Sequence, residues 1–340
     1  MKDASSLCSP AYDAVIIVSF GGPEGPDEVM PFLEHVVTGR RVPRERLTEV
    51  AKQYDLFGGV SPINSQNRAL VSALGTQLAE ASIPLRVYWG NRHSAPWLSE
   101  TVAQMAADGV RRALAFVTSP YPSQSGCRQY LDDIAAARLH VGPGAPEIDK
   151  LRLFFDHPGW IEPWVGALTE ARTKAGDDAP VLFSAHSIPE ALASTCGYQA
   201  ALLQTADLVA GRAGCHRWEL VFQSRSGPPT EPWLGPDVSA RITALAAEID
   251  GLRTVVIAPI GFVSDHMEVL FDLDVRAASA AAEAGVRLVR APTPGTHPRF
   301  VRMIRELIQE RLEPETPRLS LGRLEPTPGC GTEGCCSAVR

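Results

Sequence analysis

Short apolar runs alternate with longer amphipathic segments along most of the chain, and this alternation constrains the fold more than any other feature of the sequence. The runs are a few residues long and rich in Val, Ile, Leu and Phe, which is typical of strands buried on both faces. They begin at Ala14, Leu85, Ala113, Leu151, Pro180, Glu219, Thr254 and Val286. Segments with helical periodicity, such as 69–81 and 299–312, lie between or after them. Strands that alternate with helices predict an α/β fold whose parallel sheets carry helices on both faces.

Eight strands could form one sheet or two, and an internal similarity of the chain favours two sheets of four. Residues 85–102 resemble residues 219–238, because each segment has a strand, a polar loop, a Pro-Trp-Leu triplet and a helix. Residues 113–137 and 254–278 also match in outline, as a strand, a loop and a helix with paired acids. The chain therefore looks duplicated. In open α/β sheets ligands bind beyond the carboxyl ends of the strands, and the unusual polar residues of this chain fall there.

Length and composition agree with two domains of ordinary globular type. The 340 residues are 45% hydrophobic and 21% charged, which is enough for a normal core. We predict similar domains over residues 1–160 and 161–313, followed by a Pro- and Gly-rich tail over residues 314–340. The formal net charge of −7 argues against a nucleic-acid partner. No apolar run approaches the roughly 18 residues of a membrane helix, and the first residues lack a signal peptide's apolar stretch, so we expect a cytoplasmic protein without a transmembrane segment.

The segment FSAHS, residues 183–187, places a histidine directly after a buried strand. A side chain at the carboxyl end of such a strand points toward the ligand-binding edge of the sheet and not into the core. Because the imidazole pKa lies near neutrality, His186 could accept a proton and release it again. A hydrogen-bonded histidine with a structural role is the competing interpretation.

The segment SDHMEVLFDLD holds several acids at the predicted start of a helix. Asp265 and Glu268 are three residues apart, and Glu268 and Asp272 are four apart, so all three would share one helical face. Acids near a helix N-terminus are also stabilised by the helix dipole, which alone would account for Asp265. A row of oxygen ligands is, however, what a divalent cation would follow into a cleft.

Two polar loops, FGGVSPINSQ and YWGNRHSAPW, carry donors suited to an acidic ligand. Arg92 could clamp a carboxylate with its planar guanidinium, and His93, Ser61 and Tyr54 in or beside these loops could add hydrogen bonds. A GGP loop after the first strand allows close backbone approach, but its spacing differs from that of dinucleotide-binding and Walker loops.

Seven cysteines are unevenly placed, and Cys330, Cys335 and Cys336 lie within the last eleven residues. In a reducing compartment such crowding indicates a metal site before it indicates a disulfide framework. A tail with incidental thiols is the alternative interpretation.

Together these motifs resemble the ferrochelatases over about residues 13–313. They occur in the family's order as the GGP loop, FGGVSPI, YWGNRHSAPW, SPYPSQSGCRQY, FSAHSIPE, FQSRSGPPTEPWLGP and IGFVSDHMEVLFDLD. The combination of FSAHS with SDHxE is the most specific part of the resemblance. It implies a chelatase fold of two similar Rossmann-like domains, each a parallel four-stranded sheet flanked by helices, with a porphyrin held between them.

The resemblance also implies roles for individual residues. His186 would be the catalytic histidine and Glu268 the opposing carboxylate, and the two would bind ferrous iron or take pyrrole protons. Asp272 would continue the acid line for the iron, although Arg276 stands where many relatives carry a further carboxylate. The walls of the porphyrin site would include Phe20, Tyr121, Pro122 and Trp233. Propionates and other parts of the substrate would contact Tyr54, Ser61, Arg92, His93 and Tyr130.

Many ferrochelatases hold a [2Fe–2S] cluster with three C-terminal cysteines and one internal cysteine, and four thiolates are the usual complement of such a cluster. By this resemblance Cys330, Cys335 and Cys336 would be ligands, with Cys127 of SGCRQY as the internal one. The vicinal pair Cys335–Cys336 departs from the commonest spacing.

The expected activity is insertion of Fe²⁺ into coproporphyrin III to form coprohaem in haem biosynthesis. GGPEG and the cysteine tail resemble the bacterial forms that make coprohaem, which carries four propionates. Protoporphyrin IX, with two propionates, is the alternative porphyrin. Cobalt or nickel insertion into another tetrapyrrole, and a non-catalytic haem or iron carrier, are more remote alternatives. Porphyrin and ferrous iron are therefore the expected partners.

Overall fold

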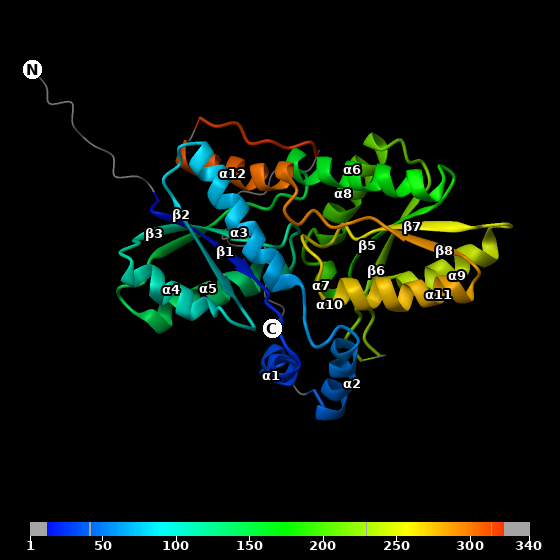
Figure 1. The fold of residues 1–340 in the computed structure, drawn as a ribbon, viewed down its shortest axis with the longest axis horizontal. Helices are drawn as coiled ribbons and strands as arrows, with labels where there is room; N and C mark the ends of the chain where they lie inside the picture. The colour runs from blue at the N-terminus through cyan, green and yellow to red at the C-terminus, as the bar shows by residue number, and fades with distance from the viewer. Residues whose placement is uncertain (1–11, 41, 229, 314, 323–340) are drawn as a thin grey trace, which may run out of the picture.

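Two parallel β-sheets covered by helices make up the protein in a computed structural model, which describes residues 12–40, 42–228, 230–313 and 315–322 (Figure 1). The first sheet has the order β2-β1-β3-β4, with β1 (Ala14–Ser19), β2 (Arg86–Asn91), β3 (Arg112–Val117) and β4 (Glu147–Lys150). The second has the order β6-β5-β7-β8, with β5 (Val181–His186), β6 (Trp218–Gln223), β7 (Thr254–Ala258) and β8 (Arg287–Arg290). Two sheets with equivalent strand orders confirm the predicted fold class.

The helices follow the strands in the alternating order that the sequence predicts. Those of the first half are α1 (Pro26–Val36), α2 (Arg44–Asp55), α3 (Ile63–Glu80), α4 (Leu98–Ala107), the π-helix η1 (Gln124–Arg128) and α5 (Gln129–Val141). Those of the second half are α6 (Pro158–Ala175), α7 (Glu190–Ala193), α8 (Tyr198–Arg212), α9 (Val238–Glu248), α10 (Met267–Val269), the π-helix η2 (Leu270–Ala277), α11 (Ala278–Glu283) and α12 (Pro298–Leu312). Within the described residues, no helix is long and apolar enough to cross a bilayer.

The strand predicted to begin at Leu151 is wrong. The fourth strand is β4, and residues 151–156 form an irregular connector between the two sheets. These residues are apolar because the connector runs through the core, where Leu151, Leu153 and Phe154 are at most 4% exposed. A buried connector and a buried strand have the same composition, so composition could not distinguish them.

One hydrophobic core is shared by both halves. Val15 and Ile17 on one face of β1, and Val181 and Phe183 on one face of β5, point into it together with side chains of α3, α6, α8 and α12. The other face of the first sheet packs on α4 and α5, and the other face of the second sheet packs on α9, η2 and α11. Because the halves share a core, the carboxyl ends of their strands are held in a fixed relative position.

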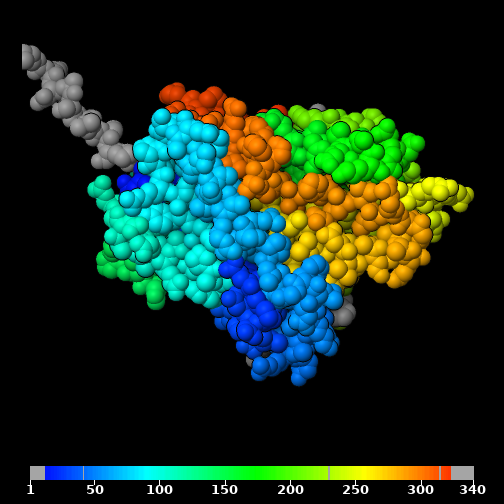
Figure 2. All heavy atoms as spheres, in the orientation of Figure 1, coloured from blue at the N-terminus to red at the C-terminus, as the bar shows by residue number. Residues whose placement is uncertain are grey.

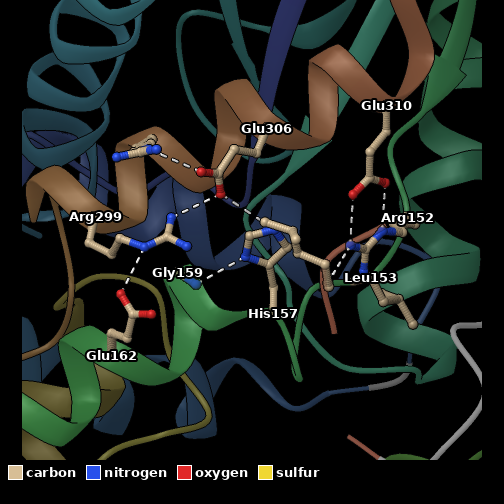
Figure 3. A network of polar contacts seen from close by, with 10 residues as sticks. Arg152, Leu153, His157, Gly159, Glu162, Arg299, Glu306 and Glu310 are labelled. Carbon is tan, nitrogen blue, oxygen red and sulfur yellow. Dashed lines mark hydrogen bonds and ion pairs between the residues drawn. The ribbon is translucent and has the colours of Figure 1, made fainter. Parts of the chain in front are cut away.

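A polar network ties the connector to α12 (Figure 3). Arg152 in the connector makes two hydrogen bonds, of 2.8 and 2.9 Å, to the Glu310 carboxylate, and both side chains are at most 7% exposed. His157 caps α6 by accepting a 3.0 Å hydrogen bond from the Gly159 amide. The Arg152 guanidinium also donates to the Leu319 carbonyl at 2.8 Å, so the same network holds the start of the tail.

Helices α1 and α2, with the loop up to residue 60, form an N-terminal lobe that protrudes from the body (Figure 2, dark blue). Its small core contains Val29, Phe32, Leu33, Leu47 and Tyr54. Met267 of α10, in the second half, completes this core. The lobe therefore covers the segment that carries the acids of the SDHMEVLFDLD motif.

Candidate active site

His186 is the last residue of β5, at the carboxyl edge of the second sheet. The strand before it is fully buried, whereas a third of the His186 side chain is exposed. The Tyr198 hydroxyl donates a 2.9 Å hydrogen bond to the His186 carbonyl and so fixes the main chain. The ring Nδ1 contacts the Ser187 carbonyl, which can only accept, so Nδ1 carries a proton and Nε2 is left to react.

Glu268 faces His186 from α10, the short helix that follows β7. Its Oε1 lies 3.5 Å from His186 Nε2, and almost half of its side chain is exposed. The structure therefore brings together the two residues that the FSAHS and SDHxE motifs single out.

His186 and Glu268 stabilise each other's charge. Burial alone would lower the pKa of His186, but the charge of Glu268 and its hydrogen bond raise that pKa to about 9. Burial alone would raise the pKa of Glu268, but the charge of His186 and the same hydrogen bond lower that pKa to about 2. Near neutral pH the pair therefore holds one proton, on Nε2, between an imidazolium and a carboxylate.

Asp272 lies in η2, beyond Glu268 along the helix, and its side chain is only 9% exposed. Its carboxylate accepts hydrogen bonds from the Ser224 hydroxyl and, at 3.0 Å, from Arg276. Ser224 has a φ of 61°, which residues other than glycine rarely adopt, and follows directly after β6. Burial raises the pKa of Asp272 despite these partners, and its charge helps to raise the pKa of His186. Asp272 thus acts on the pair electrostatically while both of its oxygens are occupied.

The prediction that Asp265 shares a helical face with Glu268 is wrong, because the helix begins only at Met267. Asp265 instead accepts a 3.1 Å hydrogen bond from Arg290 of β8. Its amide donates at 3.1 Å to the side chain of Gln66, which belongs to α3 of the first half. Asp265 therefore anchors the loop before α10 across the junction of the halves.

The first half places Phe20, Arg92 and His93 directly after β1 and β2. The Phe20 ring lies 4.4 Å from the His93 ring, and the Arg92 guanidinium lies 4.5 Å from the centre of the Tyr130 ring. Arg92 also forms an ion pair with Asp133, and only 7% of its side chain is exposed. A propionate that contacts the Arg92 guanidinium would therefore bind beside the Asp133 carboxylate, which already pairs with that guanidinium.

The pKa of His93 is shifted in the direction opposite to that of His186. Burial, followed by the nearby charges of Arg92 and other cations, lowers the pKa of His93 to about 3, so its ring is neutral. Its Nδ1 lies 3.0 Å from the Nδ1 of His35 at the end of α1. A neutral ring can donate one hydrogen bond to a ligand but brings no charge to it.

Tyr54, Ser61 and Tyr130 are buried, with 8%, 4% and 5% of their surfaces exposed. Burial and the charge of Glu268 raise the pKa of Tyr54, so the Tyr54 hydroxyl lies in the electric field of the Glu268 carboxylate. Ser61 lies against the GGP loop, where a Cβ on Gly22 would come within 2.7 Å of the Ser61 Cβ. The glycines of this loop therefore let neighbouring side chains pack closely against its backbone.

The two aromatic residues predicted as further wall residues differ in their exposure. Tyr121 is 2% exposed in the shared core, and its hydroxyl donates to the Ile260 carbonyl at 2.8 Å. The polar end of Tyr121 thus finds a partner inside the core, and its role as a wall residue stays a prediction. Trp233 is partly exposed and lines a hollow of about 390 Å³ together with Gln223 and Asp237.

Cys127 lies in η1 and is 2% exposed, with its sulfur 3.8 Å from the Tyr121 carbonyl oxygen. The other three predicted cluster ligands, Cys330, Cys335 and Cys336, lie outside the described residues. In the part of the chain that the structure describes, no group of three or more His, Cys, Asp or Glu side chains is arranged to hold a metal ion.

Gln223 is a residue of the site that the sequence argument missed. It is the last residue of β6, 1% exposed, and its side-chain amide donates a 2.8 Å hydrogen bond to the Glu268 carbonyl. The only local signal in the sequence is an amide at the end of the apolar run that begins at Glu219, and the structure adds that this amide pairs in register with His186.

The family model described as ferrochelatase matches residues 12–312. The chain belongs to the ferrochelatase family. This ferrochelatase is 51% identical to the coproporphyrin III ferrochelatase of Frankia alni, over 97% of this chain and 88% of that protein. It is 50% identical to the ferrochelatase of Rhodopirellula baltica, over 96% and 94% of the two chains. It is 49% identical to the coproporphyrin III ferrochelatase of Mycobacteroides abscessus, over 94% of each chain.

Solved chelatase structures share the fold of this ferrochelatase. SirB from Bacillus subtilis with Fe³⁺ matches with a TM-score of 0.56 at 12% identity, over 90% of this chain and 99% of that one. DR2241 from Deinococcus radiodurans, described as similar to chelatases, matches with a TM-score of 0.54 at 14% identity, over 87% of this chain and 55% of that one. At these identities the likeness concerns the fold alone.

Proposed function

We propose that this ferrochelatase inserts Fe²⁺ into coproporphyrin III to form coprohaem in haem biosynthesis, in the cytoplasm. The observation that carries the chemistry is the 3.5 Å separation of His186 Nε2 and Glu268 Oε1 at the exposed end of β5. The choice of porphyrin is supported by the relatives from Frankia alni and Mycobacteroides abscessus, which are named coproporphyrin III ferrochelatases.

The pair has to exchange its proton before it can act as a base. In the resting enzyme Nε2 of His186 is protonated and faces the Glu268 carboxylate. A divalent cation that approaches Glu268 lowers the pKa of the neighbouring imidazolium, because like charges disfavour the protonated form. The proton then leaves for solvent, and the lone pair of Nε2 becomes available. Iron as substrate thus prepares the base that its own insertion requires.

Iron insertion releases two pyrrole protons, because free porphyrin carries two N–H groups and Fe²⁺ replaces both. Neutral His186 accepts one proton on Nε2, and the Nδ1–H hydrogen bond to the Ser187 carbonyl keeps the ring oriented meanwhile. That proton passes to Glu268 or to water, since the carboxylate lies next to Nε2, and His186 can then accept the second. A rigid site that bends the macrocycle would expose its nitrogen lone pairs and favour both steps.

We assign the substrate contacts to the side chains around His186 and Glu268. Phe20 and Trp233 supply accessible aromatic surface, and Arg92 with His93 supplies donors for a propionate. Tyr54, Ser61 and Tyr130 would need to become more exposed than they are here before their hydroxyls could reach a propionate. Asp272 would assist iron through its charge, since Ser224 and Arg276 occupy its oxygens.

We also propose that a [2Fe–2S] cluster is held by Cys127, Cys330, Cys335 and Cys336. Two observations on the described residues fit this ligand set. The Cys127 sulfur lies next to the Tyr121 carbonyl, and the Tyr121 ring packs at 6.3 Å on Phe155 of the connector. The described tail reaches the same connector, where the Leu321 amide donates to the Asp156 carbonyl at 2.9 Å. When bound, the cluster would supply a thiolate-ligated iron centre that joins the tail to the first half.

Two assays test these proposals. In an anaerobic assay with Fe²⁺ and either porphyrin, kcat/KM should be higher for coproporphyrin III, and a clear preference for protoporphyrin IX would overturn the choice of substrate.

Anaerobically purified protein should show visible absorption, about two iron atoms per chain and acid-labile sulfide. A colourless protein without sulfide would remove the cluster. Cys127→Ser should abolish the absorption, whereas Cys215→Ser, a change at another buried cysteine, should leave it unchanged.

A further inference from the structure

Gln223 lies between the strand that carries His186 and the helix that carries Glu268. It pairs in register with His186 at the end of two neighbouring parallel strands. Its side-chain amide makes two hydrogen bonds, one buried and one partly buried, in opposite directions. Oε1 accepts from the Ser184 hydroxyl at 3.0 Å, and Nε2 donates to the main-chain carbonyl of Glu268 at 2.8 Å.

The chemistry of these partners fixes the orientation of the amide. The Glu268 carbonyl can only accept, so the nitrogen of Gln223 must face it and the oxygen must face Ser184. Ser184 is 0% exposed and lies two residues before His186 in β5. Gln223 therefore connects the main chain of one catalytic residue to the strand of the other through two directed contacts.

The position of Glu268 needs such a contact because its helix is irregular. Helix α10 has only three residues, and its N-cap residue, His266, makes no side-chain capping hydrogen bond. The helix then widens into the π-helix η2 at Leu270, where the regular hydrogen-bond spacing changes. Glu268 lies in the first turn of this irregular helix, where the main-chain N–H groups have no partner within the helix, so a contact from outside the helix adds to the anchoring of its main chain.

We propose that Gln223 is a positioning residue that sets the distance between the Glu268 carboxylate and His186 Nε2. This inference rests on the proposed role of the pair in iron insertion. The side chain of Gln223 is 1% exposed and contacts the main chain of Glu268, so it would act on the reaction through the position of Glu268. Loss of the Nε2 hydrogen bond lets the carboxylate move relative to the imidazole, and a displacement of about 1 Å at a catalytic group can cost about 100-fold in rate.

The test compares Gln223→Met with Thr205→Val. Methionine keeps the length and burial of glutamine but cannot donate to the Glu268 carbonyl. The Thr205 hydroxyl donates a buried 2.8 Å hydrogen bond to the Phe155 carbonyl. Thr205→Val is therefore the matched control, because it also removes one donor to a main-chain carbonyl, but away from His186 and Glu268. In anaerobic iron insertion, Gln223→Met should lower kcat at least about tenfold with the porphyrin KM within about threefold. Thr205→Val should keep kcat within about twofold at a similar loss of thermal stability.

Ser184→Ala supplies a second, milder variant, because it removes the partner that orients Gln223 and keeps the donor to Glu268. It should lower kcat by about threefold without weakening porphyrin binding. Unchanged kcat in both Gln223→Met and Ser184→Ala overturns the inference, and so does a fall in porphyrin affinity that matches the fall in kcat. If Gln223→Met does not fold, the result for Ser184→Ala decides. Glu268→Gln, measured alongside, distinguishes a failure of the proposed function from a failure of the positioning role. If Glu268→Gln retains activity, the proposed function fails. If Glu268→Gln loses activity and the Gln223 and Ser184 variants retain it, only the positioning role fails.

Discussion

The two halves share one strand order but use the ends of equivalent strands differently. In the first half β1 ends at Ser19, which pairs in register with Asn91 of β2. In the second half β5 ends at His186, which pairs in register with Gln223 of β6. Ser19 and Asn91 are 0% exposed, whereas a third of the His186 side chain is exposed. The same scaffold position is therefore buried in one half and partly exposed, beside Glu268, in the other.

The amides at the ends of β2 and β6 show the same divergence. Asn91 donates to Asn64 and to the Ala95 carbonyl, each at 3.0 Å, and so closes a polar network within the first half. Gln223 reaches the carbonyl of Glu268 instead. The third pair of equivalent positions is Cys127 and Glu268, each of which lies ten residues after its strand, β3 or β7. Cys127 lies within the π-helix η1, and Glu268 lies just before the π-helix η2. On one fold, the first half thus offers a thiol where the second offers a carboxylate.

The imidazoles of His93 and His186 differ in charge because their charged neighbours differ. His93 lies beside Arg92, and its pKa is lowered to about 3, chiefly by burial. His186 is partly buried and lies beside Glu268, which raises its pKa to about 9. A neighbouring charge of opposite sign therefore decides which of the two rings holds a proton, and function depends on these neighbours more than on the fold.

The comparison requires that the two halves keep a fixed relative position, which the buried ion pair of Arg152 and Glu310 helps to hold. Arg152→Met should therefore have the largest effect on stability of the variants considered. The substitution leaves the Glu310 carboxylate buried without its partner, which should lower the free energy of unfolding by about 3–5 kcal/mol. The double variant Arg152→Met/Glu310→Met removes both charges and should recover most of the loss in denaturant unfolding. Equal stability of the single variant and the wild type would show that the network does not hold the halves together.

Sequence reasoning predicts the fold well where burial and pattern coincide. The runs at Ala14, Pro180 and Thr254 are strands because they are buried on both faces and flanked by helices. The run at Leu151 fails because a connector that passes through a shared core is equally apolar. The sequence contains no local signal for a core that two sheets share, since that core forms only from contacts distant along the chain.

In the site, His186 and Glu268 are predictable because each stands at the end of a buried strand or the start of the helix after one. Asp265 is misplaced because α10 starts without a capping side chain, so the sequence carries no start signal at Met267. The role of Gln223 depends on a hydrogen bond to a residue 45 positions away, which no local pattern encodes.

Titration of the two imidazoles by NMR should sharpen the comparison. We expect His186 to titrate near pH 9 and His93 to stay neutral until the pH falls toward 3. Since the folded pKa of His186 exceeds its ordinary 6.5, its contribution to stability is complete below pH 6.5 and is lost as the pH rises through about 9. In Glu268→Gln the pKa of His186 should fall well below its wild-type value, and that of His93 should not move. An unchanged His186 pKa in this variant would show that Glu268 is not the cause of the shift.

Ser19→Ala should have the smallest effect, because Ser19 is the structural counterpart of His186. Its hydroxyl accepts a buried 2.8 Å hydrogen bond from Asn67, and the loss should cost about 1–2 kcal/mol of stability. Iron insertion should stay within about twofold of the wild-type rate at a temperature where both proteins are folded. A large loss of activity would mean that the end of β1 takes part in the chemistry, and the contrast between the halves would not hold.

The most direct test of the account is single-turnover iron insertion under anaerobic conditions with porphyrin already bound to Glu268→Gln and, separately, to His186→Ala. Porphyrin fluorescence reports binding, and the change in porphyrin absorption reports insertion. We predict that both variants bind porphyrin within about threefold of the wild-type affinity but insert Fe²⁺ at least about 100-fold more slowly, since each lacks one partner in the proton exchange. Insertion at a near-normal rate by either variant would contradict the assignment of the chemistry to this pair.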